Sequence, residues 1–477
     1  MKPEYQSRLR RLYPSPKTGI VHLGLGAFFI AHGSIYIKEA MEQSGGDWGV
    51  AGVSLRSSDI RDKLVGQDCL YNALELSDQG IKSQVVDVVT SVLFAPEYPR
   101  AVLKVMTAET TKIVSLTITE KGYCRGSRDT MLDLEHPDIK HDLQNLVPKS
   151  GPGFLVRALE MRWKRGLRPF TVLSLDNLPS NGLLTRQIVS EFASRIDLNF
   201  AHWLKTECKF PCSMVDRIVP ATSDALRNRA CEINGHYDEA VVAHEPFRQW
   251  VIEDDFVDNC RPDLGLVGVK LVSDVAPFEQ MKLRMLNGAH SAIAYLGSLA
   301  GFETVAEAIC DEGIEVFIEG LWREDLGLSL DAPPETSLES YAAQLLERFC
   351  NPEICHLLEQ IAMDGSQKLP QRILAPLFEN LSAGKPYKRL LAVIAAWLRY
   401  IESRSKSGQS ELNDPYQQEL TRAAKKASND TALVENILKI APGYGDLPTH
   451  RIADELVVIM FQLGNFCDTA RFEGNLQ

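Results

Sequence analysis

No apolar run in this chain approaches the roughly 18 uninterrupted residues that a membrane-spanning helix needs. The first residues, MKPEYQSRLRRLYPSPKTG, also lack the apolar stretch that a secretory signal peptide carries. From these two absences we expect a cytoplasmic protein that does not associate with a membrane.

Positive charge is also in short supply. Lys and Arg total 51 against 63 Asp and Glu, which gives a formal net charge of −12 at pH 7. Nucleic acids and anionic membrane surfaces attract basic proteins, so we expect neither as a partner. An anionic small molecule remains compatible with the composition, provided that basic side chains gather locally around it.

The ten cysteines form no repeated framework. Cys208 and Cys212, and likewise Cys350 and Cys355, have the spacing of half a metal site, but no His-x3-His or Cys-x2-Cys pair accompanies them. In a long chain without a secretion signal, reduced thiols are the simpler interpretation. We therefore expect no metal.

The apolar patterns change in kind along the chain. Short apolar or β-branched runs alternate with helical patterns in the first part, which is typical of a mostly parallel α/β sheet. We predict strands over residues 20–23, 48–55, 112–123, 170–182 and 265–275, and a helix over 31–41. Later patterns are helical, over 279–299, 337–349, 390–403 and 432–440. The sequence thus predicts an α/β domain over residues 1–277 and a mostly α-helical domain over 278–477.

A glycine pair directly follows the first predicted strand. In IVHLGLGAFFIAH, residues 20–32, Gly24 and Gly26 directly follow the strand, and a helical pattern runs from about residue 31. This order is typical of a Rossmann-type unit, in which the glycines let the backbone approach a dinucleotide pyrophosphate. We expect both glycines, with Ala27 and Phe28 after them, to bind the cofactor. The third glycine of the usual fingerprint is missing because Phe29 takes its place, so a turn that serves packing alone remains the alternative.

The end of the second predicted strand, LRSSD, bears on the choice of cofactor. Asp59 is the nearest acid and could accept hydrogen bonds from ribose hydroxyls, which favours NAD. Arg56 with Ser57 and Ser58 would instead suit the 2′-phosphate of NADP, or the serines could cap a helix. NAD is the preferred interpretation.

One helical pattern, MKLRMLNGAHSAIAYLG at 281–297, carries three polar residues among core residues. On an α-helix with about 100° per residue, Asn287 lies about 140° and His290 about 80° from Lys282, so all three can reach one small ligand. Apolar surroundings would make the lysine a usable general base, and the amide could donate to a developing alkoxide. His290 could bind the same hydroxyl. A snorkelling lysine beside satisfied core polar groups is the alternative.

Two acid-containing stretches lie in settings that favour function. Asp176 and Asn177 follow a predicted strand, and ligands bind beyond the carboxyl ends of parallel strands. Asp216 and Arg217 lie in the apolar stretch CSMVDRIVP, where a charged pair is costly unless it is used. An interdomain salt bridge is the alternative for the second pair.

Together these motifs resemble the polyol-specific long-chain dehydrogenases, also called the mannitol dehydrogenase family. The matching stretches span nearly the whole chain and include IVHLGLGAFFIAH, VSLTITEKGYC, SLDNLPSNG, FPCSMVDRIVP, EPFRQWVIEDDFV and MKLRMLNGAHSAIAYLG. EKGYC, IKHDL and IAMDGSQKLPQRIL are most similar to the branch that acts on mannonate. The resemblance implies a metal-independent, NAD-dependent oxidoreductase that interconverts D-fructuronate and D-mannonate, with an oligomer possible but not required.

The resemblance also implies roles for individual residues. Lys282 would be the general base, Asn177 and Asn287 would stabilise the oxyanion, and His290 would orient the reacting hydroxyl. The implied binding residues are Asp216 and Lys368 for substrate, and Gly24 and Gly26 for the NAD pyrophosphate.

A hexuronate carboxylate would need a cationic clamp in this acidic chain. Lys368 and Arg372 lie four residues apart in DGSQKLPQR and would share a face on a helix, although Pro370 disturbs a regular one. A solvated basic face is the alternative, and the likeness to the mannonate branch favours the clamp.

One stretch departs from the family. Relatives usually show Phe-His-Arg-Ala-His after the second glycine, whereas Phe29 and Ile30 replace the first His and the Arg here. We expect cofactor affinity or substrate fit to differ as a result.

Mannitol 2-dehydrogenase, tagaturonate reductase and a non-catalytic nucleotide-binding sensor remain alternative functions.

Overall fold

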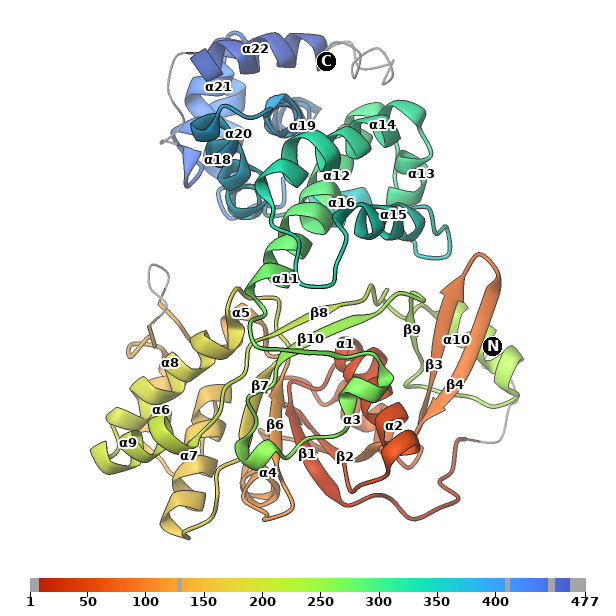
Figure 1. Cartoon of the computed structure of the whole chain (residues 1–477), viewed down its shortest axis with the longest axis vertical. Coiled ribbons are helices and arrows are strands. Elements are labelled where there is room, and N and C mark those ends of the chain that lie inside the picture. The colour runs from red at the N-terminus through yellow and green to blue at the C-terminus, as the bar shows by residue number, and fades with distance from the viewer. Residues whose placement is uncertain (1–7, 127–130, 408–411, 445–450, 464–477) are drawn as a thin grey trace. The chain divides into compact units, whose positions relative to one another are not determined.

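A computed structural model describes residues 8–126, 131–407, 412–444 and 451–463 (Figure 1). The chain divides into two compact units, Met1–Ala276 and Pro277–Gln477, here called unit 1 and unit 2. Unit 1 holds the strands of the described residues, and unit 2 is helical. The predicted fold class, a Rossmann-type domain followed by a mostly α-helical region, is confirmed.

The main sheet of unit 1 has five strands in the order β5-β2-β1-β6-β7, and every neighbouring pair is parallel. The chain starts in the centre, builds outward on one side, and then crosses to the other side of β1. This order produces a topological switch point between β1 and β6, where open α/β sheets bind ligands. The strands are β1 (Thr18–Leu23), β2 (Gly49–Ser54), β5 (Val89–Phe94), β6 (Ile113–Leu116) and β7 (Thr171–Ser174).

Apolar side chains pack on both faces of this sheet. Val21 and Leu23 of β1 belong to one hydrophobic cluster, and Ile20 belongs to the other, because successive strand residues point to opposite faces. The helices that contribute to the first cluster are α4 (Pro99–Met106), α6 (Pro137–Gln144), α7 (Gly151–Lys164), α8 (Asn181–Ser194) and α9 (Leu198–Glu207). Those of the second are α1 (Ala27–Ala31), α2 (Gly33–Ser44) and α3 (Asp59–Val65).

Two small sheets complete unit 1. One has the order β4-β3-β9 and the other β11-β10-β8. Their strands are β3 (Tyr71–Ser77), β4 (Gly80–Val86), β8 (Ser213–Asp216), β9 (Val242–His244), β10 (Gln249–Glu253) and β11 (Lys270–Val272). The remaining helical elements are α5 (Thr119–Gly122), α10 (Asp224–Asn234), η1 (Val257–Asn259) and η2 (Leu264–Val267).

Four predicted elements of unit 1 have the wrong extent. The strand predicted over 170–182 is only β7, which ends at Ser174, because a turn follows and α8 begins at Asn181. The strand predicted over 112–123 ends at Leu116, because Thr119 adopts φ +62° and the short helix α5 follows. The run 265–275 contains only the three-residue strand β11 after a 3-10 turn. The helix predicted over 31–41 is two helices, because His32 leaves helical geometry at φ −130°, ψ −76°.

Unit 2 is organised around α19 (Lys388–Ser407), which packs against α12 (Ala289–Ala300), α20 (Gln417–Lys426) and α22 (Arg451–Leu463). The segments η3 (Lys282–Gly288), η4 (Leu321–Leu326) and η6 (Pro370–Leu374) are π-helical turns, and η3 packs against the other two. No described helix is both long and apolar enough to span a membrane. The other elements are α11 (Ala276–Met281), α13 (Val305–Ile309), α14 (Glu312–Gly320), η5 (Gly327–Ser329), α15 (Leu338–Phe349), α16 (Leu358–Ala362), α17 (Gly365–Leu369), α18 (Ala375–Ala383) and α21 (Asp430–Leu438).

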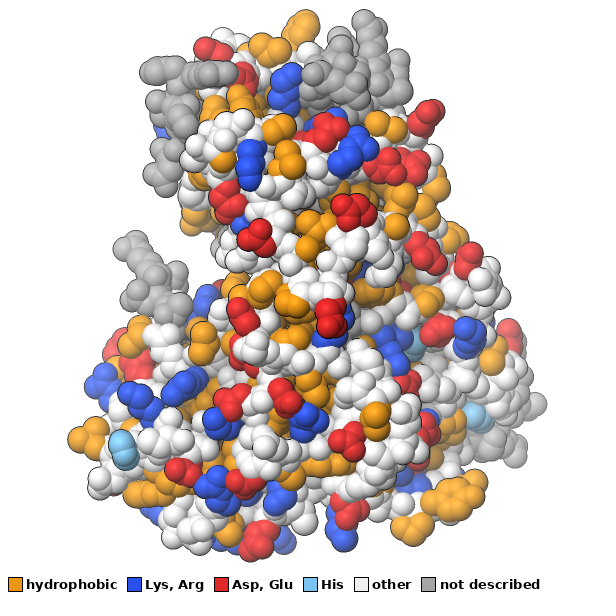
Figure 2. Space-filling view, in the orientation of Figure 1, with side chains coloured by type: hydrophobic (Ala, Val, Ile, Leu, Met, Phe, Trp, Pro, Cys, Tyr) orange, Lys and Arg blue, Asp and Glu red, His pale blue; other side chains and the backbone are white. Residues whose placement is uncertain are grey.

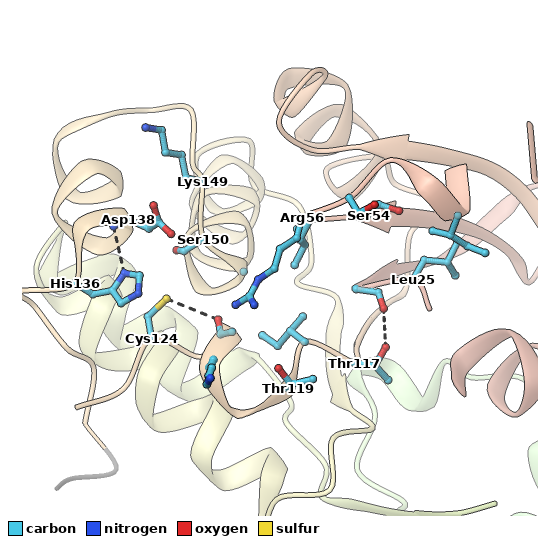
Figure 3. Close-up of a pocket in the computed structure, with 18 of the residues that line it drawn as sticks. Leu25, Ser54, Arg56, Thr117, Thr119, Cys124, His136, Asp138, Lys149 and Ser150 are labelled. Atoms are coloured by element: carbon cyan, nitrogen blue, oxygen red, sulfur yellow. Dashed lines mark hydrogen bonds between the residues drawn. The ribbon is translucent and has the colours of Figure 1, made fainter. Parts of the chain in front are cut away.

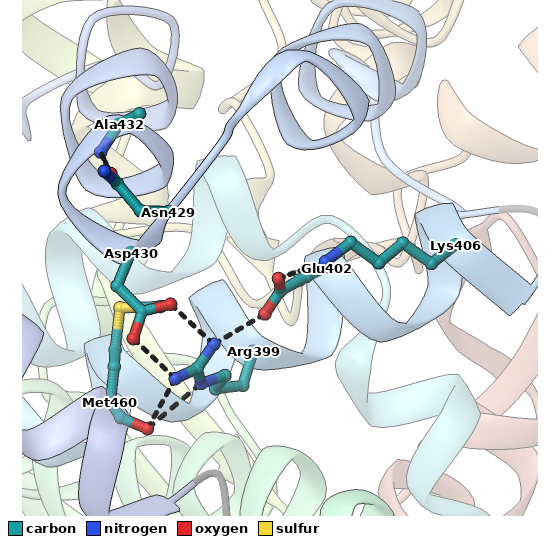
Figure 4. A network of polar contacts seen from close by, with 7 residues as sticks. All are labelled: Arg399, Glu402, Lys406, Asn429, Asp430, Ala432 and Met460. Carbon is teal, nitrogen blue, oxygen red and sulfur yellow. Dashed lines mark hydrogen bonds and ion pairs between the residues drawn. The ribbon is translucent and has the colours of Figure 1, made fainter.

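Arg399 joins three of these helices (Figure 4). Its guanidinium binds both carboxylate oxygens of Asp430 on α21 at 2.8 Å, and it donates to the main-chain oxygen of Met460 on α22 at 2.8 and 3.0 Å. A further bond of 2.7 Å reaches Glu402 on α19 itself. A planar guanidinium can satisfy all of these acceptors at once, which a lysine cannot.

Acidic and basic side chains are interspersed on the face of each unit shown in Figure 2. Ion pairs on the surface of unit 1 include Arg168 with Glu207 and Asp258, and Arg61 with Glu97. The net negative charge is therefore spread over many small groups of mixed sign.

Candidate active site

A pocket of about 620 Å³ opens at the carboxyl ends of β1, β2 and β6 (Figure 3). Its lining includes Gly24 after β1, Ser54 at the end of β2, and Thr117 after β6. This is the switch point of the sheet, as expected for a Rossmann-type ligand site. Gly26, Ala27 and Phe28, which were predicted to bind the cofactor, are not among the lining residues.

Gly24 and Gly26 are glycines for different structural reasons. Gly24 adopts φ +89°, and a Cβ there would collide with the carbonyl oxygen of Thr117, so the protein itself requires a glycine. A Cβ on Gly26 would meet only the oxygen of Gly24 at 3.7 Å, an ordinary contact. The open space at Gly26 fits the close approach of a ligand such as a pyrophosphate.

The residues predicted to select between NAD and NADP lie at the end of β2. Asp59, Arg56 and Ser57 all line the pocket, and Arg56 and Asp59 are exposed. Ser57 Oγ also accepts from the main-chain N–H of Asp59 at 3.1 Å, and Ser58 Oγ donates to Asp62 at 2.8 Å. These bonds lie at the start of α3, but Ser58, the N-cap residue, makes no side-chain hydrogen bond to the helix backbone.

Phe29 and Ile30, the residues that depart from the family pattern, lie in the core. Their side chains are 1% and 0% exposed, and Phe29 stacks on the ring of His22 with centroids 3.5 Å apart. The hydroxyl of Tyr71 donates to the carbonyl of Ile30 at 2.7 Å. The two substitutions relative to the family pattern therefore affect the packing of the core next to the pocket and not the residues that line it.

Asp176 and Asn177 at the end of β7 have separate environments. Asp176 is buried and accepts hydrogen bonds from the N–H groups of Ile118 and Thr119 and from the hydroxyl of Tyr123, at 2.8–3.2 Å. Burial raises the pKa of this carboxyl, and the hydrogen bonds oppose that shift. Asp176 therefore holds the turn after β6, whereas Asn177 is exposed.

Asp216 ends β8 and is buried, as is Arg217 beside it. The Arg217 guanidinium donates to the main-chain oxygens of Ala31 and Glu245, at 2.8 and 3.2 Å, so it fastens α1 within unit 1. Burial lowers its pKa to about 10.

Lys282 and Asn287 lie on a π-helical turn, η3. The α-helical angle of about 140° assumed for them is wrong here, because a π-helix forms i→i+5 bonds and turns less per residue, so residue i+5 lies much nearer to residue i around the helix axis. The turn therefore brings the lysine and the amide to one face. Both are half-buried, and π-helical turns are frequent at functional sites.

Side chains from other elements supply donors to this irregular turn. The indole N–H of Trp322 donates to the Met285 oxygen at 2.9 Å. Arg372 Nη1 and Ser291 Oγ donate to the Asn287 oxygen at 3.4 and 3.1 Å. Buried carbonyls need such partners wherever the regular ladder is broken, so these contacts maintain the π geometry.

His290 is 8% exposed and faces a second histidine. Its ring lies 5.2 Å from that of His356 in an edge-on arrangement, and its Nε2 has no hydrogen-bond partner among the described residues. Burial is the main reason that its pKa is well below 6.5, and His356, Arg348, Arg372 and Lys282 lower it further. A neutral imidazole with a buried nitrogen unsatisfied is a candidate ligand-binding group.

Lys368 lies near Arg372, where α17 passes into the π turn η6. Burial lowers the pKa of Lys368, and the Arg372 guanidinium lowers it further. Its contacts are long, 3.5 Å to the Ile361 oxygen and 3.9 Å to Asp364. The segment is anchored by Ser366, whose N–H and hydroxyl both donate to Asp414, at 2.9 and 2.6 Å.

The structure therefore gathers Lys282, Asn287, His290, Lys368 and Arg372 in unit 2, through the packing of η3 on η6. His356 belongs to the same group and was missed, because an isolated histidine 12 residues before Lys368 has no spacing that marks it. Asn177, Asp216, Asp59 and the glycines lie in unit 1. Within the described ranges, no three His, Cys, Asp or Glu side chains are placed to hold a metal ion.

Residues 18–265 match the mannitol dehydrogenase Rossmann domain, and residues 274–460 match the mannitol dehydrogenase C-terminal domain. The chain belongs to the mannitol dehydrogenase family. It is 42% identical over 403 residues to D-mannonate oxidoreductase of Escherichia coli (strain K12), covering 83% of this chain and 82% of that protein. It is 40% identical over 440 residues to mannitol 2-dehydrogenase of Aspergillus fumigatus, covering 90% and 87%.

Two solved structures resemble this chain over almost its full length. A D-sorbitol dehydrogenase in substrate-free form has a TM-score of 0.88 at 32% identity, covering 97% of this chain and 96% of that one. The mannitol 2-dehydrogenase of Pseudomonas fluorescens, in a ternary complex with NAD and D-mannitol, has a TM-score of 0.82 at 33% identity, covering 98% and 96%. This protein is accordingly an oxidoreductase of the family.

Proposed function

We propose that this oxidoreductase interconverts D-fructuronate and D-mannonate with NAD as cofactor. The observation that carries the proposal is the group of cationic side chains in unit 2. Lys368 and Arg372 lie close enough to lower the pKa of the lysine, in a chain whose net charge is −12. Asp364 and Asp414 offset part of the cost of this partly desolvated cationic pair. A further anion such as a hexuronate carboxylate would stabilise it more.

In this proposal the chemistry of the alcohol is performed by η3 and α12. Lys282 takes the hydroxyl proton in oxidation and returns it in reduction, and the Asn287 amide donates to the developing alkoxide. His290, kept neutral by burial, binds the substrate hydroxyl through Nε2. NAD, when bound, supplies the hydride acceptor. Asn177 and Asp216 are proposed to contribute a second amide and a substrate contact, on the strength of the family motifs alone.

The pocket of unit 1 is the proposed NAD site. The glycine turn at Gly24, the open space at Gly26 and the exposed Asp59 fit a dinucleotide, and the related Pseudomonas fluorescens structure is a complex with NAD. Asp59 would accept from the ribose hydroxyls, and Arg56 nearby is the group that would instead favour NADP. An NADPH preference in kinetics would count against the assignment to Asp59.

Mannitol 2-dehydrogenase activity is the second candidate, because fungal enzymes with that name are 40% identical to this chain, almost as similar as D-mannonate oxidoreductase at 42%. A panel of reductions with NADH, followed by loss of its absorbance, separates the two. We expect a higher kcat/KM for D-fructuronate than for D-tagaturonate or D-fructose. Equal or better reduction of fructose would favour the mannitol enzyme, and NADH binding without turnover of any ketose would favour a nucleotide-binding sensor.

A further inference from the structure

A buried imidazole lies directly beneath the proposed NAD pocket. His22, the penultimate residue of β1, is 0% exposed and is paired in parallel register with Ser115 of β6. Its Nδ1 lies 2.8 Å from the Ser115 hydroxyl, and its Nε2 lies 2.8 Å from the Thr117 hydroxyl. His22 therefore links, through hydrogen bonds, the two strands that flank the switch point.

The hydrogen-bond network assigns every proton in this chain of groups. The Thr117 hydroxyl donates to the main-chain oxygen of Gly24 at 2.8 Å, so its oxygen must accept from His22 Nε2–H. Burial lowers the pKa of His22 to about 3, against the smaller opposing effect of the Gly24 carbonyl, so the ring is neutral near pH 7. Nδ1 then carries no proton and accepts from Ser115. One tautomer, Nε2–H, satisfies all three groups.

The chain of bonds ends on the turn that requires glycine. Gly24 stands at φ +89° against the Thr117 carbonyl, and its N–H donates to Val53 of β2 at 2.9 Å. Gly24 is thereby held by β2 on one side and, through Thr117, by β6 on the other. Both Gly24 and Thr117 line the pocket, whereas His22 does not.

We propose that His22 is a positioning residue for the dinucleotide, acting through the Thr117 hydroxyl on the backbone of Gly24. An aliphatic side chain could fill the same volume, but it could not donate at one end and accept at the other. Phe29 stacks on the imidazole with an interplanar angle of 13° and so restricts the plane of the ring. This contact is a structural role for the phenylalanine that replaces the usual family histidine. This inference rests on the proposed use of the pocket for NAD.

The hydrogen bonds from His22 through Thr117 to Gly24 form a relay. Three substitutions in the full chain test it: Thr117→Val, Thr117→Ser and His22→Leu. Valine matches threonine in shape but lacks the hydroxyl, whereas serine keeps it. We expect Thr117→Val to weaken NADH binding about tenfold, the worth of one lost hydrogen bond, while Thr117→Ser stays within about twofold of the wild type. His22→Leu should weaken binding at least as much as Thr117→Val. NADH dissociation constants come from fluorescence titration, and apo unfolding midpoints show whether each variant is folded.

A second measurement does not depend on NADH. Nitrogen NMR shifts of histidine in the apo protein distinguish the two neutral tautomers, and we expect His22 to be the Nε2–H tautomer. Its signal is assigned by its loss in His22→Leu. If that variant does not fold, the shift that Thr117→Val produces assigns the signal instead. An Nδ1–H tautomer, or NADH affinities of Thr117→Val and Thr117→Ser that equal each other, would overturn the relay alone. Wild-type protein that binds no NADH would overturn the proposed function and this inference together.

Discussion

The guanidinium of Arg372 donates from Nη1 to the main-chain oxygen of Asn287 at 3.4 Å. The same nitrogen reaches the Ser291 hydroxyl at 3.2 Å, and no other hydrogen bond of this guanidinium to the described residues is present. Arg372 therefore has two tasks in the proposed site. It maintains the π turn that carries Asn287, and its remaining N–H groups can bind a substrate carboxylate.

An Arg372 variant should therefore affect both catalysis and substrate binding. We expect Arg372→Ala to lower kcat with fructuronate and with fructose alike, because the Asn287 backbone loses a donor. KM should rise mainly for fructuronate, because only this ketose has a carboxylate for the guanidinium to bind. Asn287→Ala should lower kcat by about 10²–10³-fold, as loss of an oxyanion donor does. Steady-state kinetics with both ketoses measure this. If Arg372→Ala affected only KM for fructuronate, the contact to Asn287 would be irrelevant to catalysis.

Lys368 is the cleaner test of the carboxylate clamp, because its contacts within the protein are long. We expect Lys368→Gln to raise KM for fructuronate by about ten- to a hundredfold, corresponding to about 1.5–3 kcal/mol for a charged hydrogen bond, and to leave fructose reduction nearly unchanged. Lys426→Gln removes the same charge from an exposed residue at the end of α20 and serves as the matched control. Equal effects on both ketoses would remove the argument for a hexuronate.

Lys282 is expected to be essential for turnover but not for cofactor binding. General-base catalysis contributes about 10²–10⁴-fold, so Lys282→Ala should lose turnover by that factor while its NADH dissociation constant stays close to the wild-type value. Lys282→Arg should recover nothing, because a guanidinium remains protonated at any useful pH. Stopped-flow absorbance and NADH titration provide the two readouts. Wild-type kcat in either variant would exclude the assigned role.

Buried histidines predict an acid-sensitive unit 1. Burial lowers the pKa of His22 and of His244 to about 3, each from an ordinary value of 6.5. Between pH 6.5 and 3 these groups bind protons in the unfolded chain but not in the folded one, so stability must fall as pH falls. Each histidine contributes a slope of about 1.4 kcal/mol per pH unit within that window. In urea unfolding between pH 4 and 7, His244→Gln should show a shallower loss than the wild type; identical slopes would contradict the prediction.

The Arg399 network is expected to stabilise unit 2. Removing the guanidinium in Arg399→Ala leaves Asp430 and the Met460 oxygen without their shared donor, and we expect a loss of about 1.5–3 kcal/mol in the free energy of unfolding. Arg399→Lys keeps the charge but cannot bind both acceptors, so it should lie between the alanine variant and the wild type. Denaturant unfolding of the full chain measures both. An alanine variant as stable as the wild type would show that the network contributes nothing.

Local patterns were sufficient for some features of this protein. The apolar run of β1 followed by Gly24 predicted the first strand and its turn, because strand burial and glycine geometry depend on near neighbours in sequence. The long helices α15 and α19 were predicted from their apolar periodicity for the same reason. The family motifs named the residues of unit 2 that pack together around η3 and η6.

Other features depend on partners that are distant in the chain. The π turn at η3 was predicted as α-helix, because its geometry is maintained by Trp322 and Arg372, 37 and 85 residues away from the carbonyls they bind. The neutral tautomer of His22 likewise depends on Ser115 and Thr117, which are 93 and 95 residues away. His356 gained its relevance only from its contact with His290.

The sequence by itself determined the family, the α/β and helical halves, and which residue types are available for proton transfer and anion binding. The tertiary structure decided which carbonyls in η3 need external donors, which guanidinium nitrogens are already used, and which histidine proton faces which hydroxyl. The physical reason is that hydrogen bonding and desolvation depend on distances between groups in space, and in this fold those groups are tens of residues apart along the chain.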